Sequence, residues 1–204
     1  MRKTILLLCI AATPLFFYSC KKDADGPGGL ESRISKIVSK DFRSQLASMG
    51  MDIYEGDKAP NVEGTISMTP NLLLQSNVPG DPPSNTQFVH YSIKFYEQEE
   101  SNNSIKFSST GYGGASPEKE ESNGAVISGS GNNFTVYGRS TVTVGSNSVV
   151  VAVIYSGTLD GSNNIKKLKR AIVVVDDSNR GNILLTNGHM RVFHDGDSKS
   201  AITR

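Results

Sequence analysis

Hydrophobic and polar residues alternate along much of the chain after residue 50. The clearest stretch runs from Phe134 to Val144, where one face carries Phe and Val and the other carries Thr, Tyr and Arg. Alternation with a period of two predicts β-strands with one buried face. Two further stretches, Val149 to Tyr155 and Leu168 to Val175, are apolar on both faces. The full set of expected strands is 62–68, 89–95, 105–107, 124–128, 134–144, 149–155, 168–175 and 183–193.

Turn-forming residues separate these stretches. Clusters of Gly, Ser, Asn and Asp at 145–147, 160–164 and 177–182 suit the left-handed backbone of tight hairpins. About eight strands without intervening helices predict an antiparallel meander, and closing such a sheet removes its exposed edges. We therefore expect a mainly β fold, an eight-stranded antiparallel barrel over residues 60–195, with a two-sheet sandwich as the alternative. Longer loops at 70–86 and 111–123 would lie at the barrel ends.

One segment has helical periodicity instead. Apolar residues recur at three- and four-residue steps from Ile34 to Met49, and Gly50 follows them as a helix stop. An amphipathic helix is expected over 31–49. Its basic face would be a solvated surface or a membrane contact. The strand beginning at Val149 is apolar on its outer face too, which favours a cover there, either this helix or a partner.

The first 20 residues resemble a bacterial lipoprotein signal. Arg2 and Lys3 precede an apolar stretch that is too short and too interrupted for a comfortable membrane-spanning helix. The segment 15–20 resembles a loose lipobox that ends at Cys20, which predicts cleavage after Ser19 and lipidation of Cys20. The alternative is an ordinary secretory signal in which Cys20 has no role.

These readings divide the chain into a signal peptide (1–19), a flexible Gly/Pro/Asp-rich tether (20–30) and a single domain (31–204). The expected location is the cell envelope, with a lipid anchor in the outer membrane and exposure at the cell surface as an option. Cysteines occur only at positions 9 and 20, so the mature domain would have no disulfide and no thiolate zinc site. Cleavage removes two of the 21 basic residues and no acidic one, and a near-neutral chain argues against nucleic-acid binding.

Two resemblances extend this description. The order of an N-terminal helix, a first strand entered by Gly64-Thr65-Ile66 and then a meander is similar to lipocalin-like (calycin) barrels. In that superfamily a Gly-x-Trp motif begins the first strand, and an Arg of the last strand packs over the Trp. Ile66 stands in the Trp position, and Arg191 is the candidate Arg. The whole chain also resembles small uncharacterised lipoproteins of Bacteroidetes type.

The sequence contains few residues in patterns typical of catalytic, cofactor-binding or metal-binding sites. No nucleophile elbow or phosphate-binding loop occurs, and we expect neither catalysis nor a cofactor. The acidic runs at 97–100 and 118–121 are expected in solvated loops. The segment 195–198 places oxygen-bearing side chains at alternate positions, as calcium loops do, but lacks the downstream acid. A polar turn explains that segment as well, and no metal site is expected.

The inward face of the barrel offers the one binding hypothesis. Its aromatic residues would either fill the core or line a small-ligand site. The last expected strand is compatible with two registers. One turns Ile183, Leu185 and Phe193 inward together with His189 and Arg191, and the other turns Leu184, Met190, Val192 and His194 inward. The first register gives the candidate ligand-binding set Tyr91, Phe95, Phe107, Phe134, Tyr155, His189 and Arg191.

Two functions follow from these alternatives. In the first, a lipid-anchored envelope protein binds a small apolar or amphipathic molecule, or a glycan fragment, inside its barrel. In the second, the barrel is filled and the protein acts through its outer surface on another envelope component. An enzymatic function is not expected.

Overall fold

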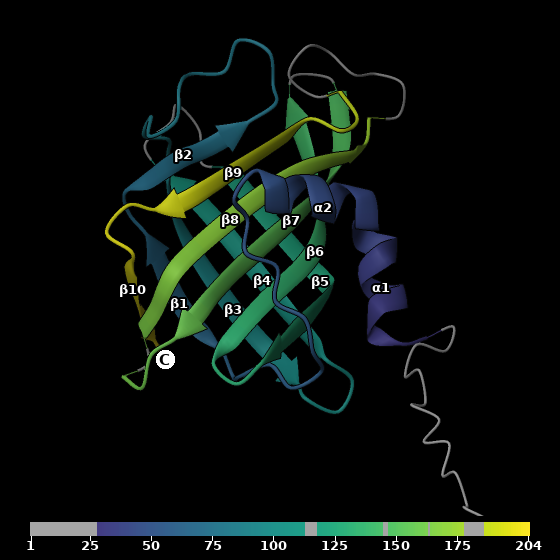
Figure 1. The fold of residues 1–204 in the computed structure, drawn as a ribbon, viewed down its shortest axis with the longest axis vertical. Helices are drawn as coiled ribbons and strands as arrows, with labels where there is room; N and C mark the ends of the chain where they lie inside the picture. Colours follow the sequence, from purple (N-terminus) through teal and green to yellow (C-terminus); the bar gives the residue numbers. More distant parts are fainter. Residues whose placement is uncertain (1–27, 113–117, 145–146, 163, 178–185) are drawn as a thin grey trace, which may run out of the picture.

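The computed structural model describes residues 28–112, 118–144, 147–162, 164–177 and 186–204. It contains two short helices followed by ten strands (Figure 1). The helices are α1 (Leu30–Ile37) and α2 (Lys40–Ser48). The strands are β1 (Gly64–Met68), β2 (Asn71–Ser76), β3 (His90–Glu99), β4 (Ser104–Tyr112), β5 (Glu118–Ser130), β6 (Asn133–Val144), β7 (Asn147–Leu159), β8 (Asn164–Asp176), β9 (Met190–Asp195) and β10 (Lys199–Thr203).

Eight of these strands form a closed antiparallel barrel, as the alternation predicts. Strands β3 to β8 follow one another as hairpins, and β1 lies beside β3. The circle closes through β10, which pairs with β1 on one side and with the first residues of β8 on the other. Closure leaves the barrel strands without a free edge, which is the physical advantage of this arrangement over an open sheet.

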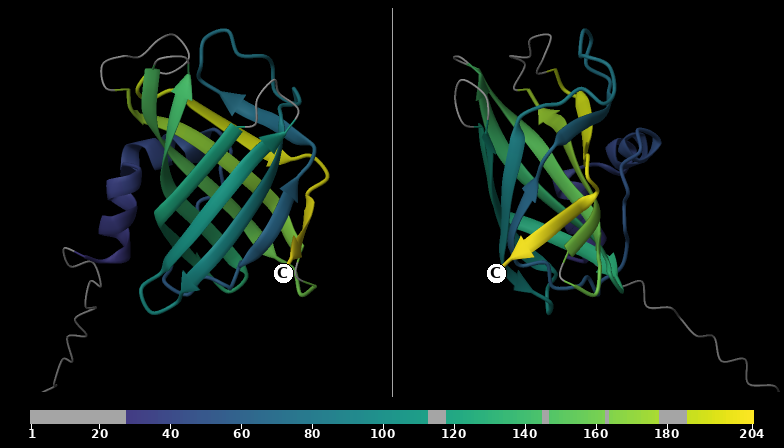
Figure 2. Two further views of the ribbon diagram at one scale, coloured as in Figure 1. Left: turned by 180° about the vertical axis from the view of Figure 1, so that it is seen from behind. Right: turned by 90° about the vertical axis from the view of Figure 1, so that its left-hand side faces the viewer.

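Strands β2 and β9 lie outside this circle and form an extension of it. β9 pairs with the second half of β8, from Lys169 to Val173, and β2 pairs with β9. The chain turns from β1 into β2 and from β9 into β10 at neighbouring places. As a result, β1 pairs with β10 inside the barrel, and β2 pairs with β9 in the extension. Figure 2 (right) shows β10 leaving the end of β9 at an angle. The barrel extends past residue 195, and β10 rather than the 183–193 segment completes it.

Two hydrophobic clusters hold the domain together. The larger one fills the barrel and includes residues from the inner faces of its strands. The second lies between the helices and the outer face of β6 to β9, where Leu46 and Ile37 pack on Ile154 and Val173. Figure 2 (left) shows the helices at one side of the barrel. The outer face of β7 is thus covered by the predicted helical segment.

That helical segment is interrupted once. Val38 is extended, and the Ser39 side chain accepts a hydrogen bond from the backbone N–H of Phe42, which caps the start of α2. The break allows α1 to run beside β5 and β6 while α2 crosses the sheet further along (Figure 1).

β2 and the first part of β5 lie in segments that were expected as loops, and β10 lies where no strand was expected. β2 has no polar face because Leu73 packs in the barrel core and Leu74 against the helix cluster, so its sequence does not alternate. β10 is short and mostly polar. β5 begins at Glu118, inside the segment expected as a loop. Of the last expected strand, residues 183–185 lie outside the described part, and β9 begins only at Met190.

Candidate functional site

The five aromatic residues of the candidate ligand-binding set come together inside the barrel. Tyr155 lies in their centre, with ring centroids 5.5 Å from Phe95 and 5.3 Å from Phe107, both edge-to-face. Phe95 contacts Phe134 in the same way at 6.4 Å. All five side chains, Tyr91 included, are buried. Such T-shaped contacts are favourable between aromatic rings, so these residues stabilise one another.

The interior around these rings is tightly filled. A methyl group on Gly138 would lie 2.4 Å from the Phe107 ring, and one on Gly157 would lie 2.4 Å from the Ile165 side chain. Both distances are too short for carbon atoms, so the glycines leave room that larger neighbours already occupy. The barrel architecture is compatible with small-ligand binding, but its centre is packed as a core.

A pair of opposite charges lies within this apolar interior. The Arg170 guanidinium of β8 forms an ion pair with the Glu120 carboxylate of β5, and both side chains are almost completely buried. Glu120 also accepts hydrogen bonds from Ser109 at 3.0 Å and from the Tyr155 hydroxyl at 3.3 Å. The guanidinium lies 4.1 Å from the centre of the Tyr91 ring, which adds a cation–π contact.

The protonation states of this cluster follow from burial and from the pair itself. Burial is the strongest single influence on Arg170 and opposes the charged guanidinium, but the Glu120 carboxylate together with Tyr91 and Tyr155 raises the pKa of Arg170. Burial, reinforced by Glu120, raises the pKa of the Tyr155 phenol far above its ordinary value. The phenol therefore stays protonated and serves as a hydrogen-bond donor. A buried charge pair with these partners holds strands from opposite parts of the barrel together.

Glu120 was expected in a solvated loop, but it lies in strand β5 and is buried. Glu120 lies on the inner face of β5, opposite Ser109 of β4. The local pattern around Glu120 is that of a strand. Glu120 and Ser122 are buried on one face, while Lys119 and Glu121 are exposed on the other. Arg170 is the charged residue on an otherwise apolar face of β8, and an isolated charge in that position indicates a buried partner.

The two remaining residues of the candidate set lie away from the aromatic rings. Arg191 donates two hydrogen bonds to Asp81 of the β2–β3 loop, at 2.6 and 2.7 Å. It lies beside Ser76 of β2, whereas Ile66 lies in β1 at the barrel closure, so the implied Arg–Trp arrangement is replaced by an ion pair. His189 precedes β9, and its Nδ1 is buried without a partner.

Both faces of β9 are buried, which explains why its register was ambiguous. Phe193 packs with the barrel core, on the face that also carries Arg191. Met190 and Val192 pack beneath the helices. The inward face is therefore that of the first register for the described residues, but the charged end of Arg191 reaches the loop rather than the barrel centre.

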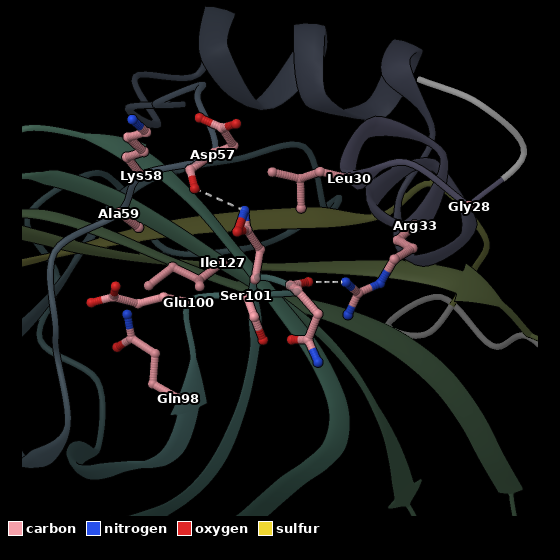
Figure 3. Close-up of a pocket in the computed structure, with 12 residues that line it drawn as sticks. Gly28, Leu30, Arg33, Asp57, Lys58, Ala59, Gln98, Glu100, Ser101 and Ile127 are labelled. Atoms are coloured by element: carbon pink, nitrogen blue, oxygen red, sulfur yellow. Dashed lines mark hydrogen bonds between the residues drawn. The ribbon is translucent and has the colours of Figure 1, made fainter. Parts of the chain in front are cut away.

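A cleft of about 1120 Å³ lies on the outside of the barrel. It lies between the start of α1, the segment 57–59 and the turn that joins β3 to β4 (Figure 3). Half-buried Leu30 provides apolar surface, and Ile127, which is buried with the barrel core, lies at the base of the cleft. Its complete lining among the described residues is Gly28, Leu30, Arg33, Asp57, Lys58, Ala59, Gln98, Glu100, Ser101, Asn102, Asn103 and Ile127.

The walls of this cleft are held in place by hydrogen bonds across it. Arg33 of α1 donates to the backbone carbonyl of Asn102, and Asn103 donates to the carbonyl of Asp57 at 3.1 Å. Gln98 bridges the backbone of Val62 and Pro60. Asp57, Lys58 and Glu100 add charges of both signs at the rim. A preformed cleft with mixed charges and an apolar base suits a polar or amphipathic partner.

Other expected features fall outside or beside these sites. Cys20 and the signal segment lie outside the described residues. In the part of the chain that the structure describes, the helices are too short and too polar to span a bilayer. Among the same residues, His, Cys, Asp and Glu side chains do not gather in groups of three or more that could hold a metal ion.

Comparison with known proteins does not place this chain in a family. No protein-family description matches the sequence, no curated protein is significantly similar to it, and no solved structure matches its fold significantly.

Proposed function

We propose that this protein is a lipid-anchored cell-envelope protein of the lipocalin-like barrel type that acts through its outer surface. In this proposal, the cleft beside α1 is the place where another envelope component binds. The protein has no catalytic role. The observation that carries the proposal is the contrast between a filled barrel interior and a preformed outer cleft of about 1120 Å³.

The packing of the interior supports an outer site. A ligand would have to displace rings that contact one another, and it would separate Arg170 from Glu120 in a region of low dielectric constant. Both changes are costly. Binding in the cleft requires no such displacement, because the lining residues already hydrogen-bond with one another and the charged rim is exposed.

The position of the cleft also supports an envelope role. Gly28, which lines the cleft, follows Cys20 by eight residues. Eight extended residues span at most about 30 Å. If Cys20 carries the lipid, the cleft stays within that distance of the membrane surface, where membrane-embedded or membrane-attached partners present their exposed parts.

Two variants in the native host test the site. Ser101→Arg fills the cleft from an exposed turn, while Ser84→Arg places the same side chain on an exposed loop at the other barrel end. After chemical cross-linking in intact cells, we expect one envelope component to be linked to the wild type and to the Ser84 variant but lost from the Ser101 variant. Equal cross-linking by both variants would contradict the proposed site.

The anchor is tested separately. Cells fed a labelled fatty acid should transfer the label to the wild-type protein and not to a Cys20→Ala variant. The Cys9→Ala variant is the matched control and should keep the label. An unlabelled wild type would remove the envelope address, whereas the cleft would still be open to the cross-linking test.

Ligand binding inside the barrel is the second candidate function. One observation favours it: Nε of the buried Arg170 has no hydrogen-bond partner, so the interior contains an unused donor. Native mass spectrometry of protein extracted from its own host distinguishes the two functions. The outer-surface proposal predicts the mass of the lipidated chain alone, whereas a retained small molecule that is lost on Arg170→Met would favour the barrel site.

A further inference from the structure

The corner at which β1 turns into β2 lies against the corner at which β9 turns into β10. Gly196 donates its backbone N–H to the Pro70 carbonyl at 2.8 Å, and Thr69 donates to a carboxylate oxygen of Asp195 at 3.2 Å. The other oxygen of Asp195 accepts from the Ser200 hydroxyl at 2.7 Å. Asp195 thus lies at the centre of the contact between the two corners.

Two carboxylates meet at this place. Asp195 is buried, with 2 % of its surface exposed, and Asp197 follows two residues later in the turn in which the Ser198 N–H donates to the Asp195 carbonyl at 3.1 Å. Among the described residues, neither carboxylate forms an ion pair with Lys, Arg or His. Adjacent acids with one member buried and no counter-charge form an electrostatically unbalanced arrangement.

Asn71 supplies a third side-chain oxygen opposite Asp195. Asn71 of β2 is directly opposite Asp195 in the β2–β9 ladder, so the two side chains share one face at close range. The Asn71 side chain is completely buried, and its Oδ1 has no hydrogen-bond partner. Its Nδ2 donates to Val89, on the side of β2 away from β9. The amide oxygen is therefore left unpaired at the position of β2 that lies opposite Asp195.

These atoms match the preferences of one kind of ligand. Two carboxylates and an amide oxygen are hard oxygen donors, and Ca²⁺ takes about six to eight oxygens in flexible geometry. Two negative charges balance a divalent cation. Asp197 is exposed, so water can complete the coordination from outside. Thiolate or imidazole ligands, which transition metals prefer, do not take part.

We infer that Asn71, Asp195 and Asp197 form a calcium-binding site that joins the β1–β2 corner to the β9–β10 corner. The inference is independent of the cleft and of the lipid anchor. The third ligand comes from a strand more than 120 residues away along the chain, which is why the 195–198 segment by itself lacked the downstream acid of a calcium loop. Bound calcium would hold the barrel closure and its β2–β9 extension together.

Titration of full-length protein, extracted in detergent and freed of metal with EDTA, tests this inference. Isothermal titration with CaCl₂ should show one site, with a dissociation constant of about 0.1 to 1 mM, as in extracellular calcium modules. Calcium at 10 mM should raise the melting temperature, followed by near-ultraviolet circular dichroism, by about 3 to 8 °C. Magnesium should have a smaller effect, because it requires a tighter octahedral site.

The variant Asp197→Asn isolates the charge. Asp197 is exposed, and Asn can still accept the backbone N–H of Lys199 that Asp197 Oδ1 now accepts at 2.9 Å, so the turn is preserved. This variant should lose at least about tenfold in calcium affinity. The matched control, Glu121→Gln, removes an exposed acid from β5 and should bind as the wild type does. A wild type without binding heat or thermal shift, or an Asp197 variant with unchanged affinity, would overturn the inference.

Discussion

The two faces of β7 and β8 are both buried, yet they are stabilised differently. On the inner face, aromatic rings surround an ion pair, and both Arg170 and Tyr155 hydrogen-bond to Glu120 of the distant strand β5. On the outer face, Ala152, Ile154, Ala171 and Val173 form a smooth apolar surface on which the helices rest. The inner contacts join the barrel across its width, whereas the outer contacts attach a short segment to one side of it.

This difference shows which parts of the domain should respond together. Removing an inner charge leaves its partner buried and affects the whole closed sheet, because the barrel strands have no free edge at which damage could stay local. Removing an outer contact weakens the attachment of two short helices, and short helices depend on packing rather than on their own stability. The inner face should therefore control global stability and the outer face local stability.

The largest effect is expected for Glu120→Gln. The change leaves the Arg170 charge in the core without its counter-charge, and breaking a buried pair in this way costs about 3 to 5 kcal/mol. Urea unfolding of the variant and the wild type measures the loss. The neighbouring outward change, Glu121→Gln, should alter the unfolding free energy by less than about 0.5 kcal/mol. Equal effects of the two variants would contradict the inner–outer distinction.

Leu46→Ala should have the next largest effect. It removes a fully buried side chain from the helix cluster and costs about 2 to 4 kcal/mol of local stability. We expect limited proteolysis to cleave within 30–60 much faster than in the wild type, while amide protons of the barrel strands keep their protection from exchange. Loss of protection throughout the barrel would mean that the helices are part of its cooperative unit.

Asp81→Asn tests an ion pair at the edge of the barrel. The variant weakens two hydrogen bonds from the partly exposed Arg191, so a loss of about 1 to 2 kcal/mol is expected. The hydrogen bonds from Arg191 lower the pKa of Asp81 below its usual 3.8. The ionised form is thus favoured in the folded state, and this contribution is complete above pH 4 and is lost as the pH falls further. Thermal unfolding between pH 2 and pH 5 should show a smaller decline for the variant.

Glu31→Gln should have the smallest effect. Glu31 pairs with Arg43 across the two helices, and hydrogen bonding from Arg43 lowers the pKa of Glu31. Because the Glu31 side chain is 45 % exposed, solvent screens the pair, and a loss below about 1 kcal/mol is expected. Urea unfolding at low and at high salt measures it, and the difference from the wild type should shrink as salt is added. A loss as large as that of Glu120→Gln would show that burial does not set the strength of these pairs.

Alternation along the sequence was sufficient for most of the barrel. Strands β3, β6 and β7 have one apolar and one polar face, or two apolar faces, over many residues, and that pattern follows directly from the pleat of a strand. The apolar outer face of β7 also indicated a cover, and the amphipathic segment at 31–49 was a suitable candidate for it. These inferences needed only local spacing.

Only the tertiary structure decided the rest, because the relevant contacts join residues far apart in the chain. β2 and β10 are strands through their partners rather than through their own periodicity. Glu120 is buried because Arg170, fifty residues later, compensates its charge in the folded state. Asn71 faces Asp195 through the β2–β9 ladder. Local sequence determines which face of a strand prefers the interior, but long-range pairing determines which polar groups can remain there.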